Sequence, residues 1–234
     1  AVADAGRLVM ELPRLWLRPR HLPIADPVHW DGAEIVEDLL AQGRGLVFLT
    51  PHLGSFEVAA QAYAERFGAR QPVTVLYRPA RQPWLRELEE TARARPALAT
   101  APASLAGVRQ MMRALRRGET VGLLPDQVPP VGMGVWAPFF GRPAYTMTLA
   151  ARLVQQTGAA VGVMWCERLP RGGGYLVHAM ALPEPLPENG GDEAAAAAIN
   201  RCMEVVIRLK PTQYLWGYHR YKSPRGAATG AGAP

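Results

Sequence analysis

One short segment fixes the architecture of this chain, Leu46-Val47-Phe48-Leu49-Thr50-Pro51-His52-Leu53-Gly54-Ser55-Phe56-Glu57. Its first five residues form a short, continuous apolar run, which is typical of a buried strand. A helical pattern follows at Val58–Phe67 and ends at Gly68. The segment therefore predicts a strand, a short loop and the start of a helix, with His52 exposed in the loop.

Strand and helix patterns continue to alternate on both sides of this segment. Further strands are predicted at 73–77, 120–124, 159–166 and 175–182. Further helices are predicted at 34–42, 83–95, 104–117, 144–156 and 192–209, the last with Asp192 as its N-cap. Residues 128–143 are rich in Pro and Gly and predict a loop. The alternation predicts an α/β fold, a single domain with a mixed, mostly parallel sheet flanked by helices.

The sequence divides into an N-terminal segment at 1–31, a main domain at 32–225 and a tail at 226–234. The tail is Ala, Gly and Pro, and we expect it to be disordered. In the N-terminal segment, Leu8–Arg18 interleaves apolar residues with arginines. Such a segment suits the headgroup layer of a membrane, and it equally suits a helix docked on the domain's own core. We expect Pro13 to limit any single helix here.

Composition narrows the class of protein. The chain has 234 residues, about half of them hydrophobic, and a net charge of +6 that favours anionic partners. Its two cysteines, Cys166 and Cys202, lack metal-site spacing, and no apolar run approaches the roughly 18–20 residues that span a bilayer. The chain begins at Ala1 rather than Met, so a membrane anchor upstream stays open.

The loop after the first strand carries the chemistry. His52 directly follows the strand, Gly54 permits a tight backbone path, Ser55 is a natural N-cap, and Glu57 lies in the first helical turn. We expect Glu57 to accept the Nδ1 proton of His52, which leaves Nε2 free to take a proton from an alcohol. The alcohol would attack a carbonyl directly, with no covalent enzyme intermediate. The alternative is a histidine whose hydrogen bonds merely tie the loop.

Several other features of the sequence have more than one interpretation. Asp126 also follows a predicted strand, and sites in open α/β sheets form where strands end. Amides near Gly54, at the start of the helix, are candidate oxyanion donors. A basic helix can dock an acidic carrier protein or anionic lipid, or simply present a solvated cationic face: Arg109, Arg113, Arg116 and Arg117. Three aromatics of the Pro-rich loop can line an acyl channel, enter a membrane or pack locally: Trp136, Phe139 and Phe140. The sequence contains no G-x-S-x-G, P-loop or H-E-x-x-H motif, which argues against serine hydrolases, nucleoside triphosphatases and zinc proteases.

Five blocks occur in order along residues 45–225: His52–Glu57, an H-x4-E motif; Tyr77–Pro79 with Arg93 and Arg95 downstream; Leu124–Gln127; Pro138–Thr146; and Gln213–Lys222. In this order they resemble the late acyltransferases of lipid A biosynthesis, the lauroyl/myristoyl transferase family within the lysophospholipid acyltransferase superfamily. Ser55 stands where many members carry Asn, and the transmembrane helix typical of the family is not found in this chain.

The resemblance implies a glycerolipid acyltransferase-like fold and an acyl donor carried on acyl carrier protein, or less often on coenzyme A. It implies no further cofactor or metal, no nucleic acid, and an anionic glycolipid acceptor, a lipid A precursor with a free hydroxyl. The expected location is the cytoplasmic face of the bacterial inner membrane, peripheral or anchored by a segment missing from this chain. By matching position it implies these roles: His52 as general base, Glu57 as its partner, and Arg78, Arg93, Arg95 and Asp126 in substrate binding.

Two other functions remain open. One is an acyltransferase for a different acceptor, such as a lysophospholipid, an ornithine lipid or another glycolipid. The other is a non-catalytic protein that binds lipid or a carrier protein through the same surfaces. Replacing His52 with Ala separates binding from catalysis, because only an enzyme would lose turnover.

Overall fold

A seven-stranded sheet forms the centre of the molecule, in the order β1-β9-β8-β2-β5-β3-β4. The structure is a computed structural model that describes residues 1–80, 82–93, 95–187 and 189–226. Every neighbouring pair in the sheet is parallel except β8 and β9. The predicted α/β fold with a mixed, mostly parallel sheet is therefore confirmed. The strands are β1 Val28–Asp31, β2 Leu46–Leu49, β3 Val73–Tyr77, β4 Leu98–Pro102, β5 Thr120–Leu123, β8 Ala160–Arg168 and β9 Tyr175–Ala181.

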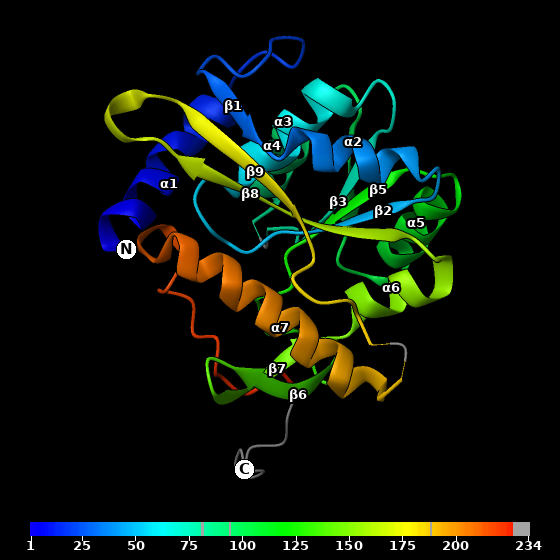
Figure 1. The fold of residues 1–234 in the computed structure, drawn as a ribbon. Helices are drawn as coiled ribbons and strands as arrows, with labels where there is room; N and C mark the ends of the chain where they lie inside the picture. The colour runs from blue at the N-terminus through cyan, green and yellow to red at the C-terminus, as the bar shows by residue number, and fades with distance from the viewer. Residues whose placement is uncertain (81, 94, 188, 227–234) are drawn as a thin grey trace.

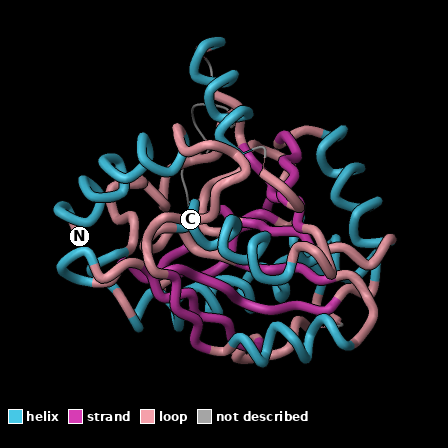
Figure 2. The backbone as a smooth tube through the Cα atoms, turned by 90° about the horizontal axis from the view of Figure 1, so that it is seen from above, coloured by secondary structure: helices cyan, strands magenta, loops and turns pink. Residues whose placement is uncertain are grey.

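Helices cover both faces of this sheet (Figures 1 and 2). They are α1 Val2–Trp16, α2 Ala33–Ala41, α3 Phe56–Phe67, α4 Pro83–Arg93, α5 Leu105–Arg116, α6 Leu149–Thr157 and α7 Gly191–Leu209. Leu46 and Phe48 of β2 pack in the cluster with α1, α2 and α3, whereas Val47 and Leu49 pack in the cluster with α5, α6 and α7. Because both faces of β2 are covered, the strand is apolar at every position.

The expected loop at 128–143 is wrong over its second half. Residues 134–139 form β6, Gly134–Phe139, which pairs antiparallel with β7, Arg142–Met147, against α7 (Figure 1). The two-residue turn, Phe140-Gly141, has both residues at positive φ, which suits a tight hairpin. Phe rarely takes that conformation, so the sequence offers little sign of the turn. The helix that we expected from residue 144 accordingly begins only at α6.

The sequence patterns also missed the two edge strands, β1 and β4. Both are short, and their residues do not form an unbroken apolar run. At the start of the last helix, Gly190 rather than the predicted Asp192 is the N-cap of α7. Asp192 lies in the first helical turn and accepts a hydrogen bond from Arg152 at 2.6 Å. Of the tail expected to be disordered, residues 227–234 lie outside the described residues.

The first half of the N-terminal segment forms the single helix α1, which continues through Pro13, so the expectation that Pro13 would limit it is wrong. The segment ends in the edge strand β1. Pro13 is exposed, which lets water satisfy the carbonyl that loses its helical partner. The opposite side of the helix docks on the domain, where Leu15 is buried in the core. No helix among the described residues combines the length and apolar character needed to cross a membrane.

Candidate active site

His52 and Asp126 are brought together by two neighbouring parallel strands. His52 follows β2, Asp126 follows β5, and the strands pair in register at Leu49 and Leu123. Because the carboxyl ends of parallel neighbours lie side by side, the two loops meet at the carboxyl end of the central strands. Gly54 keeps the first loop close to β8, since its φ is +59° and a Cβ there would lie 2.0 Å from the Cys166 carbonyl oxygen.

Asp126 is the carboxylate that orients His52. The His52 Nδ1 lies 2.7 Å from Asp126 Oδ1, and the His52 backbone N–H donates to Oδ2 at 2.9 Å. Burial acts to raise the pKa of Asp126, but interaction with His52 through charge and these hydrogen bonds outweighs it and lowers the pKa. The ionised carboxylate only accepts hydrogen bonds, so the proton of a neutral His52 lies on Nδ1. Nε2 is left as the acceptor.

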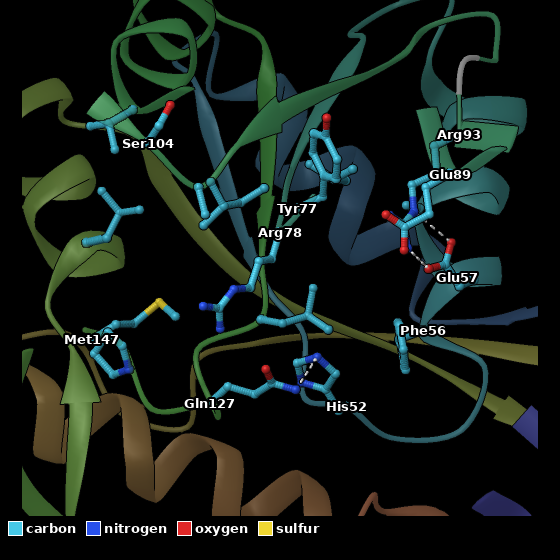
Figure 3. A pocket seen from close by; sticks show the side chains of 18 of the residues that line it. His52, Phe56, Glu57, Tyr77, Arg78, Glu89, Arg93, Ser104, Gln127 and Met147 are labelled. Carbon is cyan, nitrogen blue, oxygen red and sulfur yellow. Dashed lines mark hydrogen bonds and ion pairs between the residues drawn. The ribbon is translucent and has the colours of Figure 1, made fainter. Parts of the chain in front are cut away.

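The predicted hydrogen bond from His52 to Glu57 is therefore wrong. Glu57 points away from the ring and forms an ion pair with Arg93 of α4, in which Arg93 Nε donates to Oε2 at 3.2 Å and Nη2 donates to Oε1 (Figure 3). The reason is geometric, since α3 carries Glu57 toward α4 while the His52 ring turns toward β5. Both members of this pair line the same cavity as His52.

The C-terminal segment surrounds Asp126 from the other side. Burial, then the negative charge of Asp126 and a hydrogen bond to it, raise the pKa of Tyr214 well above its ordinary value. Arg220 also interacts favourably with Asp126, although burial lowers its own pKa. Its guanidinium donates to Tyr145 O and Thr146 Oγ1, each at 2.7 Å. Tyr214 and Arg220 belong to the last sequence block, whose connection to Asp126 is visible only in the folded chain.

Two of the amides near Gly54 that the sequence offered as oxyanion donors already have backbone partners. Gly54 N–H donates to Gln213 O at 3.0 Å, and Ser55 N–H donates to Cys166 O at 2.9 Å. Ser55 stands at the N-cap of α3, as predicted, but its hydroxyl donates to Glu11 of α1 at 2.7 Å instead of capping the helix. These bonds fix the loop beside His52 and leave both amides occupied.

Gln127 is a site residue that sequence reasoning missed. Its Nε2 lies 3.1 Å from His52 Nε2. Since Nε2 is the acceptor nitrogen of the ring, the Gln127 amide is the donor. The signal available in the sequence was its place directly after Asp126, in the loop beyond a buried strand.

These residues line a cavity of about 350 Å³ that has two chemically different ends (Figure 3). The end between α3 and α4 is polar and contains the ion pair of Glu57 and Arg93. The other end lies between α5, β7 and the start of α6 and is apolar, with Val108, Met133, Met147 and Leu149 in its wall. His52 and Gln127 are in the wall of the same cavity.

The arginines of the second sequence block separate in space. Arg78 is exposed and reaches into the cavity on the side of Gln127 and His52 (Figure 3). Arg93 lines the polar end. Arg95 is buried outside the cavity wall and donates to the carbonyl groups of Leu15 and Pro19, each at 2.9 Å. Arg95 therefore fixes the N-terminal segment to the domain rather than facing a substrate.

The aromatic side chains of residues 136–140 pack locally. Phe139 is buried and packs against Phe140 with ring centroids 4.9 Å apart, and Trp136 packs against Tyr145. None of these three aromatic side chains is in the cavity wall, which favours local packing over an acyl channel. Among the described residues, no three His, Cys, Asp or Glu side chains converge as metal ligands would.

Known proteins resemble this chain along nearly its whole length. The family model described as bacterial lipid A biosynthesis acyltransferase matches residues 1–223. The lipid A biosynthesis lauroyltransferase of Escherichia coli (strain K12) is 30% identical over 225 residues, which cover 95% of this chain and 71% of the relative. The palmitoleoyltransferase of lipid A biosynthesis from the same organism is 26% identical, over 82% of this chain and 61% of the relative. A lipid A biosynthesis acyltransferase of Shigella flexneri matches with the same identity and coverage.

Proposed function

The chain belongs to the bacterial lipid A biosynthesis acyltransferase family, and on that basis we propose that it transfers a fatty acyl group from a thioester to a hydroxyl of a lipid A precursor. The observation that carries the proposal is the His52–Asp126 pair, which presents a basic nitrogen in the wall of a cavity with one apolar end. The donor is an acyl group on acyl carrier protein, or on coenzyme A. The reaction uses no further cofactor and no metal.

His52 acts as a general base in this proposal. Its Nε2 takes the proton of the acceptor hydroxyl while the hydroxyl oxygen attacks the thioester carbonyl carbon. The carbonyl electrons move onto oxygen and return as the C–S bond breaks, and the imidazolium gives its proton to the departing thiolate. Asp126 holds the ring and stabilises the imidazolium, a role sequence reasoning gave to Glu57. A placed general base contributes typically ~10²–10⁴-fold in rate.

The two ends of the cavity suggest where the substrates lie. Hydrocarbon is best accommodated at the apolar end, beside Met133, Met147 and Leu149. The charge of Arg93 is already balanced by Glu57, whereas Arg78 is exposed to any anionic group that enters. We therefore assign Arg78 the phosphate of the acceptor or donor, which a guanidinium can bind through two hydrogen bonds.

The outer face of α1 fits contact with a membrane surface. Val2, Val9, Met10 and Leu17 are all exposed. Two pairs, Val2 with Val9 and Met10 with Leu17, are each seven residues apart, and the pairs are neighbours, so all four lie on one side of the helix. A soluble domain gains nothing from an apolar stripe of this kind in water, whereas a lipid headgroup layer accepts it. In this proposal the protein works at the cytoplasmic face of the inner membrane, held peripherally or together with a further anchor.

The test is a panel of donors and acceptors analysed by mass spectrometry. The purified protein is incubated with acyl carrier protein or coenzyme A thioesters and with lipid A precursors, lysophospholipids and ornithine lipids. We expect acylation of a lipid A precursor, and we expect His52→Ala to bind the donor but lose turnover. Acylation of glycerolipids alone would refute the acceptor, and full activity in His52→Ala would refute the enzymatic role of the site.

A further inference from the structure

A reaction through a tetrahedral intermediate needs hydrogen-bond donors for the oxyanion, and the free protein shows which groups are available. The amides of Gly54 and Ser55 are bonded to backbone carbonyls. The His52 backbone N–H is bonded to Asp126. Preorganised donors of this kind are usually a large term in catalysis, so a side-chain donor held close to His52 would contribute directly to the reaction.

Gln127 has such a group in the right place. Its side-chain amide lies 3.1 Å from His52 Nε2 and lines the cavity. The backbone around it is fixed on both sides, because Asp126 is bonded to His52 and the Val128 N–H donates to the Tyr218 hydroxyl at 2.9 Å. The amide is therefore held next to the reacting nitrogen by the same loop that carries Asp126.

The contact with Nε2 must be exchanged when the acceptor binds. His52 Nε2 has one lone pair in the plane of its ring, which the Gln127 N–H occupies in the free protein. The acceptor hydroxyl needs that lone pair, and its arrival releases the amide within about one hydrogen-bond length of the attacking oxygen. The thioester carbonyl oxygen lies only one bond beyond the carbon that this oxygen attacks.

We propose that Gln127 is a further catalytic residue, whose released amide donates to the carbonyl oxygen of the thioester as that oxygen gains negative charge. The inference rests on the proposed acyl transfer and adds the oxyanion donor to it. The amide makes no covalent bond and transfers no proton, so the proton balance remains that of His52. Arg78 is the competing donor in the cavity, and its exposed guanidinium lacks the fixed contact with His52 that Gln127 has.

The test separates binding of the transition state from binding of the ground state. Gln127→Ala removes the donor, Gln127→Glu keeps the shape but replaces the amide with a carboxylate, and Gln156→Ala, on the exposed surface of α6, is the matched control. Each variant is assayed for kcat and KM and for its affinity toward two donor analogues. One analogue carries a tetrahedral phosphonate in place of the thioester carbonyl, and the other carries an unreactive thioether.

We expect Gln127→Ala to lower kcat by ~10²–10³-fold with little change in KM, as loss of one oxyanion donor does. Its affinity for the phosphonate should fall by a similar factor, while its affinity for the thioether stays within about twofold. The kcat of Gln127→Glu should fall further than that of Gln127→Ala, because the glutamate places a negative charge beside the developing oxyanion. The rate loss in Gln127→Ala should be the same at different pH values, because the amide that it removes does not titrate.

Unchanged phosphonate affinity in Gln127→Ala would overturn the proposal. A rate loss in Gln127→Ala that disappears when the pH is changed would also overturn it, because Gln127 would then only position His52. A loss of phosphonate selectivity in Arg78→Ala alone would assign the oxyanion to Arg78. These outcomes leave the proposed function intact. That function fails separately if the wild-type protein transfers no acyl group to any acceptor.

Discussion

Asp126→Asn is the sharpest test of how His52 is oriented, because each carboxylate oxygen of Asp126 accepts a hydrogen bond from a different group of His52. Oδ1 faces the His52 ring at 2.7 Å and Oδ2 faces the His52 backbone N–H at 2.9 Å. An asparagine has one oxygen and one NH₂ group, so it can accept from only one of these donors. If its oxygen stays with the backbone, its NH₂ faces Nδ1, and the ring must move its proton to Nε2.

That tautomer has no basic nitrogen facing the cavity. In serine proteases the equivalent change from Asp to Asn lowers kcat by ~10⁴-fold with the geometry intact. The same range is expected here, equivalent to about 5.5 kcal/mol in the activation free energy. Because the asparagine would retain the shape of the side chain and the fold around it, KM and the affinity for the thioether analogue should change little.

The direct assay is ¹⁵N NMR of the His52 imidazole in wild type, Asp126→Asn and Glu57→Gln. We expect the wild-type ring to carry its neutral-state proton on Nδ1, the Asp126 variant to lose that preference, and the Glu57 variant to keep it. Glu57→Gln serves as the matched control, since Glu57 is bonded to Arg93 rather than to His52. The reasoning is refuted if the tautomer changes in Glu57→Gln and stays the same in Asp126→Asn.

Three further predictions concern the same site. The pKa of Asp126 is lowered in the folded state. The ionised carboxylate therefore stabilises the fold above its unfolded pKa of about 4, and this contribution is lost as the pH falls through the folded pKa. The free energy of urea unfolding of Asp126→Asn should depend less on pH below about 4 than that of wild type. Gly54→Ala places a Cβ 2.0 Å from the Cys166 carbonyl oxygen at a left-handed φ. It should lower the free energy of unfolding by ~3 kcal/mol or more. The control is Gly118→Ala, also at positive φ but in open space, which should lower the free energy of unfolding clearly less. Met147→Trp fills the apolar end of the cavity, and mass analysis of products from a mixture of donors should show a shift of at least ~10-fold toward shorter acyl chains; an unchanged chain profile would place the acyl group elsewhere.

The central strands could be predicted from sequence because each carries its signal locally. Leu46–Leu49 is apolar at every position, since helices cover both of its faces, and Val73–Tyr77 ends where its apolar run ends. The hairpin of β6 and β7 carries no such signal, because its turn uses Phe140 at a positive φ and its strands include Pro138 and Pro143. Helix α1 passes through Pro13 because its other side is held against the domain by Leu15 and Glu11.

Local residue patterns were enough to place a histidine at the carboxyl end of a buried strand in an α/β sheet, with an acidic residue in the first turn of the next helix. Which carboxylate that histidine would meet depended on the folded chain. Asp126 is 74 residues away along the chain, yet parallel pairing of β2 and β5 places it against the ring. Glu57 is near in sequence, but the direction of α3 carries its side chain to Arg93. Helical geometry fixes where a nearby side chain points, whereas contact between two strand ends depends on the order of strands in the finished sheet, which no local pattern encodes.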